Sequence, residues 1–231
     1  MKGKVYLIGA GPGDPGLMTL KGRELMERAD CLVYDALAAP AMLAWLKPGC
    51  EQVYVGKRAG NHAMPQEEIN QLLVKSAAKY ACTVRLKGGD PYVFGRGGEE
   101  ALALHAAGVP FEVVPGVSSA IAGPAYAGIP VTHRDFCNQF TVFTGHEGAH
   151  KTEPPLDIAG IAAAKGTKVM LMGMSRLRET MLALMEAGQG ADVPAAAIQW
   201  AATGRQKSVT ATVATLAEAV ESAGIASPRL W

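Results

Sequence analysis

The chain has 231 residues, of which 49% are hydrophobic, so it is long enough for one large domain or two ordinary ones and can bury a core. Its 22 basic and 21 acidic residues nearly balance, which excludes the positive excess that non-specific nucleic-acid binding needs. No apolar run reaches the roughly 18 residues of a membrane span, and no signal-peptide pattern follows Lys2 and Lys4. We therefore expect a cytoplasmic protein with neither a nucleic-acid partner nor a membrane partner.

Apolar runs and stretches with helical spacing alternate through the first half of the chain. Short apolar runs predict strands, and apolar residues recurring every three or four positions predict helices. The predicted strands span residues 4–9, 31–35, 51–56, 82–89 and 110–116, and the predicted helices span residues 17–28, 65–77, 99–107 and 118–123. A regular alternation of strands and helices is typical of a largely parallel sheet, so we expect an α/β domain here.

The pattern restarts after "AGIPVTHRDF" (Ala127–Phe136), a stretch with Gly128, Pro130 and several polar residues. We place a domain boundary there, which gives two α/β domains at residues 1–132 and 133–231. The second domain has predicted strands at residues 139–145, 167–173, 195–200 and 208–213 and predicted helices at residues 175–187 and 216–223. Its last two strands are close enough in the sequence to form an antiparallel hairpin, so we expect a mixed second sheet.

The four cysteines do not form a metal-binding pattern. Cys31, Cys50, Cys82 and Cys137 lie far apart, with no CxxC pair and no histidine at ligand spacing, so we expect no metal site. Cys31 and Cys82 lie in apolar, strand-like runs and are interpreted as small core residues.

The first glycine loop, "LIGAGPGDPG" (Leu7–Gly16), follows a predicted strand and precedes a predicted helix, as a dinucleotide fingerprint requires. Asp35 also lies at the distance of a ribose-binding acid. However, Asp14 stands where the third glycine belongs and would repel a phosphate, and Pro12 and Pro15 lack the N–H groups that bind a pyrophosphate. We therefore favour a ligand without phosphate, and keep an NAD-dependent dehydrogenase and a turn without any ligand as alternatives.

The second glycine loop follows the fourth predicted strand, at the end where ligands bind in open α/β sheets. Gly88 and Gly89 allow the backbone to approach a ligand closely, and the Asp90 carboxylate is suited to hold an ammonium group. The sequence contains no G-x-x-x-x-G-K-[ST] motif, which excludes a P-loop. An amino-acid moiety fits this loop better than a phosphate, although an Asp-Pro after glycines is also ordinary turn chemistry.

Six segments together resemble one known family, the tetrapyrrole (corrin/porphyrin) methylases. In order, they are "VYLIGAGPGDPGLMTLKG", "ADCLVYDAL", "VGKRAGNH", "RLKGGDPYVFGRGGEE", "VVPGVSSAIAGPAYAGIPVTHR" and "FTGHE". They lie within residues 5–147, and the second half matches more loosely through "VMLMGMSRL" and "AAIQWAATGRQKSV". The resemblance implies two α/β domains with S-adenosylmethionine bound in the cleft between them, and a homodimer.

The resemblance also implies which residues contact S-adenosylmethionine. In the first half they are Pro12, Gly88, Gly89, Asp90, Val93, Ser118 and Ser119, and in the second half they are Met172 and Ala201. The family more often has glycine at the position of Ala201, which weakens the match there.

The implied reaction is methyl transfer to two ring carbons of uroporphyrinogen III, giving precorrin-2 and S-adenosylhomocysteine, a step of siroheme or cobalamin biosynthesis. A sulfonium is already activated, so the protein mainly has to hold donor and acceptor at near-attack distance, and no nucleophile is needed. The resemblance assigns Asp35 the role of proton acceptor and Lys57 that of proton donor.

The implied substrate is a polycarboxylate, whereas the chain has a net charge of only +1. Basic side chains must therefore gather at the substrate site. The candidates are Arg58, His62, Arg96, His133, Arg134 and His146.

Several alternatives remain open at this point. A methylase of the same fold could act on a later corrin intermediate, an RNA ribose or a modified histidine, and the chain could be the methylase part of a bifunctional siroheme-type assembly. A protein that only carries a tetrapyrrole leaves the two glycine loops unexplained. Relatives of this type continue past "SPRLW" with an apolar strand, so we expect either a fragment or a second sheet without that final strand.

Overall fold

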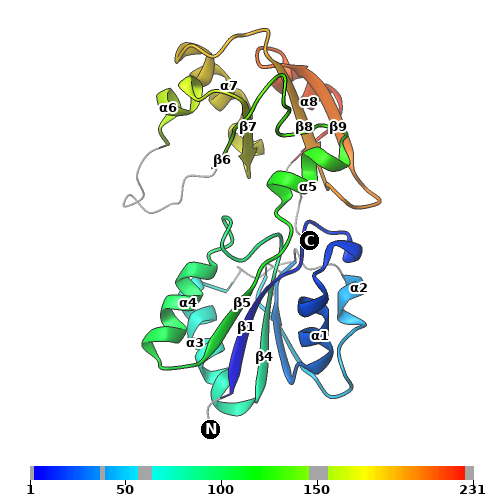
Figure 1. The fold of residues 1–231 in the computed structure, drawn as a ribbon, viewed down its shortest axis with the longest axis vertical. Coiled ribbons are helices and arrows are strands. Elements are labelled where there is room, and N and C mark those ends of the chain that lie inside the picture. Colours follow the sequence, from blue (N-terminus) through cyan, green and yellow to red (C-terminus); the bar gives the residue numbers. More distant parts are fainter. Residues whose placement is uncertain (1–2, 37–39, 57–63, 146–155, 227–231) are drawn as a thin grey trace. The chain divides into compact units, whose positions relative to one another are not determined.

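The computed structural model of the chain describes residues 3–36, 40–56, 64–145 and 156–226. Its described residues form two compact units, which divide between Ser119 and Ala120 (Figure 1). This division precedes the boundary predicted at residues 132–133, because the helix α5 (Ser119–Tyr126) has contacts in the second unit. For example, Gln206 Nε2 donates a 3.0 Å hydrogen bond to the Tyr126 carbonyl. The limits 1–132 and 133–231 remain a prediction.

The first unit is built on a five-stranded sheet in which every strand pairing is parallel, as the sequence predicted. The order of the strands across the sheet is β3-β2-β4-β1-β5. The strands are β1 (Lys4–Gly9), β2 (Cys31–Tyr34), β3 (Glu51–Tyr54), β4 (Cys82–Lys87) and β5 (Phe111–Val114). All five carboxyl ends therefore lie along one edge of the sheet, and β4 and β1 lie at its centre.

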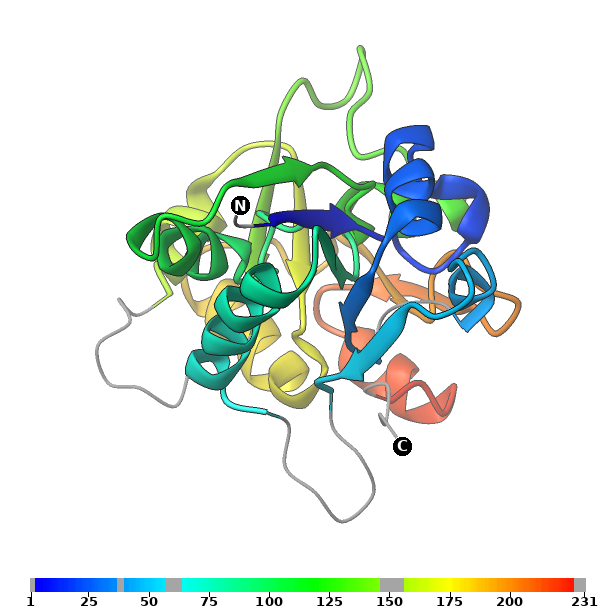
Figure 2. The ribbon, with the colours of Figure 1, turned by 90° about the horizontal axis from the view of Figure 1, so that it is seen from below.

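Two helices cover each face of this sheet (Figures 1 and 2). The helices α1 (Leu20–Arg28) and α2 (Pro40–Leu43) lie on one face, and α3 (Gln66–Lys79) and α4 (Gly97–Ala106) lie on the other. Successive strand residues point to opposite faces, so Leu7 packs in the core with α3 and α4 while Ile8 packs in the core with α1 and α2. Cys31 is buried in the former core, and burial raises the pKa of its thiol to about 11.

The predicted helix at residues 17–28 starts later in the structure. Pro15–Leu17 forms a turn of 3-10 helix, and the Asp14 side chain accepts a hydrogen bond from Gly16 N at its start. The α-helix begins only at Leu20, where the Thr19 hydroxyl accepts from Gly22 N at 3.1 Å. Threonine is a favourable N-cap, so the local sequence accounts for this start.

The second unit contains two separate pairs of strands. β6 (Phe140–Thr144) and β7 (Thr167–Leu171) are parallel, whereas β8 (Pro194–Gln199) and β9 (Lys207–Thr212) form the antiparallel hairpin that the sequence predicted. In the described part of the chain, the expected mixed sheet is thus divided into a parallel and an antiparallel sheet. The helices α6 (Ile158–Ala163), α7 (Leu177–Glu186) and α8 (Leu216–Ser222) pack with these strands around one apolar core.

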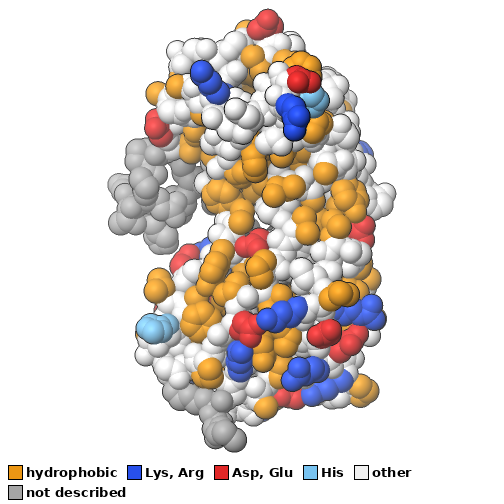
Figure 3. All heavy atoms as spheres, in the orientation of Figure 1, with side chains coloured by type: hydrophobic (Ala, Val, Ile, Leu, Met, Phe, Trp, Pro, Cys, Tyr) orange, Lys and Arg blue, Asp and Glu red, His pale blue; other side chains and the backbone are white. Residues whose placement is uncertain are grey.

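The helices and the surface charges can be described for the part of the chain that the structure covers. No helix there is long and apolar enough to cross a membrane. On the face drawn in Figure 3, basic and acidic side chains are interspersed among the described atoms rather than gathered by sign.

Candidate active site at the carboxyl ends of the first sheet

The loops after β1 and β4 are joined by backbone hydrogen bonds. Gly89 N donates to the Gly11 carbonyl at 2.8 Å, and Gly11 N donates to the Gly89 carbonyl at 3.2 Å. Both glycines have positive φ values, +75° for Gly11 and +64° for Gly89, which side chains disfavour. The two glycine motifs that the sequence singled out therefore form one structure at the centre of the sheet edge.

The loop after β5 joins them through a close approach of main chains. A Cβ atom added to Gly116 would lie 2.7 Å from Gly9 Cα, and one added to Gly9 would lie 2.6 Å from Gly116 Cα. Real Cβ atoms do not approach backbone so closely, so both positions require glycine.

We expect Gly116→Ala to lower the free energy of unfolding by about 3 kcal/mol, because the added methyl group has to displace rigid backbone. Urea unfolding measures this loss. Gly98→Ala is the matched control, since a Cβ on Gly98 meets nothing within 4 Å and Gly98 lies inside α4. The control should keep or slightly raise the stability. Equal stabilities of Gly116→Ala and Gly98→Ala would contradict this account.

Asp90 links the loops after β4 and β5. Its Oδ1 accepts a hydrogen bond from Tyr92 N at 2.8 Å, and its Oδ2 accepts one from Gly116 N at 3.0 Å. A carboxylate offers about four lone-pair directions, so the two oxygens retain acceptor capacity for an ammonium group. Ser118 and Ser119 lie beside this loop, because a Cβ on Gly89 would be 3.9 Å from Ser118 Cα and from Ser119 N.

Several backbone positions of the first glycine loop have no N–H free to bind a phosphate. Asp14 Oδ1 accepts a 2.7 Å hydrogen bond from Gly16 N, so a carboxylate already lies at the start of the 3-10 turn. Pro12 and Pro15 have no N–H to donate. The half-buried Pro12 lies directly after the paired Gly11. This arrangement disfavours a dinucleotide and fits a ligand without phosphate.

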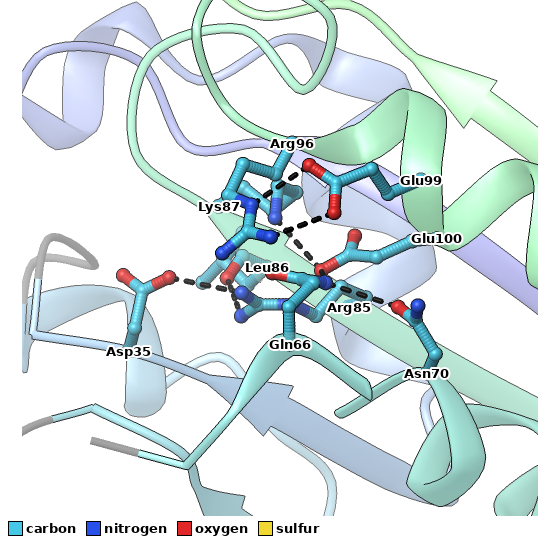
Figure 4. Close-up of polar contacts among 9 residues, drawn as sticks. All are labelled: Asp35, Gln66, Asn70, Arg85, Leu86, Lys87, Arg96, Glu99 and Glu100. Atoms are coloured by element: carbon cyan, nitrogen blue, oxygen red, sulfur yellow. Dashed lines mark hydrogen bonds and ion pairs between the residues drawn. The ribbon is translucent and has the colours of Figure 1, made fainter. Parts of the chain in front are cut away.

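Asp35 directly follows β2 and is part of a charged cluster on the α3/α4 face of the sheet (Figure 4). Arg85 Nη2 donates to Asp35 Oδ2 at 3.1 Å, and Arg85 Nε donates to Glu100 Oε1 at 3.0 Å. Lys87 Nζ donates to the same Glu100 oxygen at 2.9 Å. Sequence reasoning selected Asp35 but missed Arg85, Lys87 and Glu100, although charged residues inside a predicted central strand were a usable signal.

Burial lowers the pKa of the Lys87 ammonium below its ordinary 10.5; nearby Arg85 lowers it further, while Glu100 opposes the shift. Between the lowered pKa and 10.5 the unfolded chain binds more protons than the native chain, so this group makes stability rise with pH. We expect the stability of the wild type relative to Lys87→Met to increase across that window. Urea unfolding at a series of alkaline pH values measures it. Lys75→Met is the control, because Lys75 is on the exposed side of α3. This variant retains Lys87, so its stability relative to Lys87→Met should rise with pH as that of the wild type does. A stability difference between wild type and Lys87→Met that stays constant with pH would contradict this prediction.

Val93 and Arg96 lie on the loop between β4 and α4. Val93 is exposed, and its N–H donates to the Asp90 carbonyl at 3.3 Å. Arg96 has a left-handed φ of +58° at the start of α4, and its Nε and Nη2 donate to the two Glu99 oxygens at 2.8 and 2.7 Å. The exposed Arg96 guanidinium is thus oriented by the first turn of its own helix (Figure 4).

In the second unit, the predicted cofactor residues lie after β7 and β8. Met172 is 55% exposed and has a φ of +56°, and Ala201 stands between Trp200 and Ala202, whose φ values are +53° and +57°. Left-handed non-glycine residues cost about 1–3 kcal/mol each and concentrate at functional sites. Both strand ends therefore have a strained backbone that the sequence does not show.

His133 and Arg134 lie on a short exposed hairpin of the second unit. His133 N donates to the Cys137 carbonyl at 2.8 Å, and Cys137 N donates to the His133 carbonyl at 2.9 Å. The His133 ring also packs at 4.8 Å from the Phe136 ring. The remaining predicted site residues, Lys57, Arg58, His62 and His146, lie outside the described residues.

Residues 3–36, 40–56, 64–145 and 156–226 contain no group of three or more His, Cys, Asp or Glu side chains suited to a metal ion. The charged cluster around Glu100 includes two cations and is not such a site. Among the described residues, the candidate site therefore consists of carboxylates, basic side chains and the exposed main chain of glycines.

Comparisons with known proteins give consistent matches. The family described as Tetrapyrrole (Corrin/Porphyrin) Methylases matches residues 4–217. A uroporphyrinogen-III C-methyltransferase of Synechocystis is 47% identical over 230 residues, covering 100% of this chain and 88% of that protein. A protein of the same name from Bacillus subtilis is also 47% identical over 99% of this chain, but the chain spans only 47% of its length.

A solved structure gives the same result for the fold. The uroporphyrin-III C-methyltransferase of Thermus thermophilus, in complex with S-adenyl homocysteine, superposes with a TM-score of 0.79 at 40% identity. The match covers 94% of this chain and 86% of that chain.

Proposed function

Because the chain belongs to the tetrapyrrole (corrin/porphyrin) methylases, we propose that it transfers methyl groups from S-adenosylmethionine to two ring carbons of uroporphyrinogen III. The products are precorrin-2 and S-adenosylhomocysteine. The observation that carries the proposal is the 47% identity, along the whole chain, to a protein named for this activity of which the chain covers 88%. The dinucleotide alternative has no support among these relatives, and the Asp14 carboxylate opposes it.

The joined loops after β1, β4 and β5 fit the methionine part of the donor. We assign its contacts in the first unit to Pro12, Gly88, Gly89, Asp90, Val93, Ser118 and Ser119. S-adenosylmethionine supplies an activated methyl group on a sulfonium, and it carries an ammonium and a carboxylate but no phosphate. Bare backbone at Gly89 leaves room for close approach, and Asp90 retains acceptor capacity for the ammonium. Met172 and Ala201 remain predicted contacts from the second unit.

Asp35 is the residue we propose as proton acceptor. Carbon methylation of a pyrrole ring leaves a proton that has to be removed, and a positioned carboxylate is suited to this. The Asp35 side chain is 24% exposed, while its Oδ2 is held by Arg85, so it is both accessible and oriented. Lys57, which we propose as proton donor, lies outside the described residues.

We propose that Arg96, His133 and Arg134 bind the carboxylates of the substrate, together with Arg58, His62 and His146. Arg134→Ala should raise the KM for uroporphyrinogen III about tenfold, because a charge-assisted hydrogen bond is worth about 1.5–3 kcal/mol. The affinity for S-adenosylhomocysteine should stay unchanged in a titration. Arg178→Ala, which removes an exposed ion pair with Glu221, is the control and should alter neither quantity. Equal losses of both affinities in Arg134→Ala would count against a substrate role.

The direct test of the function is an anaerobic incubation of the chain with uroporphyrinogen III and S-adenosylmethionine. After oxidation, absorbance and mass spectrometry should detect a product with two added methyl groups. A single methyl group, or methylation only of a later corrin intermediate, would favour another methylase of the same fold. No methylation, together with thermal stabilisation by NAD, would favour the dehydrogenase.

A homodimer and a cytoplasmic location are further parts of the proposal, supported by the family. Light scattering on the purified chain measures the first, and fractionation of cells that produce it measures the second. A monomer at micromolar concentration would contradict the dimer.

A further inference from the structure

The central strand β4 buries charge on one of its faces. Val84 and Leu86 point into the apolar core with α1 and α2, whereas Thr83, Arg85 and Lys87 alternate with them and are also buried. Each buried ion loses several kcal/mol of solvation, and apolar residues of similar size are often more stable at such positions. Stability alone therefore does not explain two cations on this strand.

Glu100 holds these two cations together. It is fully buried in the first turn of α4, where the helix dipole favours a carboxylate. Its Oε1 accepts from Arg85 Nε at 3.0 Å, from Lys87 Nζ at 2.9 Å and from Gln66 Nε2 at 3.3 Å. Its Oε2 is buried without a hydrogen-bond partner among the described residues. Gln66 is in turn held by Asn70, since its Nε2 also donates to Asn70 Oδ1 at 3.0 Å.

Arg85 connects Glu100 to the surface. Its Nε faces Glu100, its Nη1 donates to the Leu86 carbonyl at 3.0 Å, and its Nη2 donates to Asp35 Oδ2 at 3.1 Å. A guanidinium is planar and rigid, so fixing two of its nitrogens also fixes the third. The side chains of Arg85, Lys87 and Glu100 are at most 5% exposed, whereas that of Asp35 is 24% exposed. Among the described residues of this network, Asp35 is thus the charged member most exposed to solvent, and it lies at the end of the chain of contacts (Figure 4).

We propose that Glu100 is a positioning residue for methyl transfer: through Arg85 it holds the Asp35 carboxylate in the orientation that accepts the proton. The inference rests on the proposed function, in which Asp35 is the acceptor. Glu100 is fully buried and touches no substrate, so its effect on the reaction passes through Arg85. Lys87 shares the Glu100 oxygen and balances the charge, since two cations then face two carboxylates.

A double-mutant cycle tests this coupling. Glu100→Gln keeps the shape and one acceptor oxygen but removes the charge that holds Arg85. We expect kcat to fall about 10-fold to 100-fold, as for a misplacement of about 1 Å, with the KM and the affinity for S-adenosylhomocysteine unchanged. In an Asp35→Asn background the same substitution should have no further effect.

Glu179→Gln is the matched control. Glu179 also lies in the first turn of a helix and also accepts from an arginine, at 2.6 and 3.0 Å from Arg176, but it is exposed. The Glu179→Gln variant should therefore have the wild-type kcat. If Glu100→Gln does not fold, Arg85→Lys serves as the test variant instead. A lysine ammonium cannot donate at once to Glu100, the Leu86 carbonyl and Asp35 in the planar geometry of the Arg85 guanidinium. The same loss of kcat, absent in the Asp35→Asn background, is then expected.

Nitrogen-15 NMR of the arginine guanidinium groups gives a readout that does not depend on activity. The Arg85 Nε–H signal should exchange slowly with water in the wild type and in Glu179→Gln, and much faster in Glu100→Gln. A fall in kcat that persists in the Asp35→Asn background, or no fall at all, would overturn the inference. If the wild type transfers no methyl group, the proposed function fails separately, and equal exchange of Arg85 in wild type and Glu100→Gln would overturn the positioning as well.

Discussion

Asp35→Asn is expected to lower kcat for methylation of uroporphyrinogen III by about 100-fold to 10,000-fold, the usual contribution of a general base. An amide does not accept the proton, but its oxygen still accepts a hydrogen bond from Arg85, so the side chain should stay in place. The expected loss is therefore chemical, and S-adenosylhomocysteine should bind as tightly as before. Steady-state kinetics and a binding titration measure the two quantities.

Asp192→Asn provides the control for this substitution. Asp192 is exposed in a turn before β8, so its variant should keep the wild-type kcat. An unchanged kcat in Asp35→Asn would remove Asp35 from the reaction and leave Lys57, or a residue not yet identified, to handle the proton.

Glu100→Leu should lower the free energy of unfolding by about 3–5 kcal/mol, because it leaves Arg85 and Lys87 buried without their shared carboxylate. Glu179→Leu is the control, since it breaks an exposed ion pair worth about 0–1 kcal/mol. Urea unfolding compares the two losses.

Replacing the whole cluster separates its two roles. The triple variant Arg85→Met, Lys87→Met and Glu100→Leu leaves no unpaired buried charge, so its stability should return to about the wild-type value or exceed it. Its methylation activity should nevertheless stay low, because Arg85 no longer holds the Asp35 carboxylate. A stable and fully active triple variant would show that the cluster serves neither stability nor catalysis.

The glycine loops were predictable because glycine and proline are strong local signals. "LIGAGPGDPG" and "RLKGGDPYVFG" could be placed at strand ends from the neighbouring apolar runs alone. The sequence did not show that Gly11 and Gly89 exchange hydrogen bonds, or that Gly9 and Gly116 approach within the reach of a methyl group. Those contacts depend on the order of the strands, which places β4 and β5 on either side of β1.

The charged cluster was less predictable because its members are distant in the sequence. Asp35 and Arg85 are 50 residues apart, and Arg85 and Glu100 are 15 apart. Charged residues are usually exposed, so a glutamate in a first helical turn is first interpreted as a surface residue. The alternation of Thr83, Arg85 and Lys87 within one strand was nevertheless visible, and it marks one polar face.

The short helices α2 and α6 were missed for a different reason. They have four and six residues, too few for a helical period to show against the surrounding apolar residues. The left-handed backbone of Met172 and Trp200 was equally hidden, because neither residue type favours it.

A crystal structure of the chain with S-adenosylhomocysteine tests the central claim most directly, namely that the joined glycine loops bind the methyl donor. We expect the amino-acid part of the ligand against the main chain of Gly88 and Gly89 and within hydrogen-bond distance of the Asp90 carboxylate. A ligand bound away from the ends of β1, β4 and β5, or an Asp90 that faces solvent beside a bound ligand, would contradict the account.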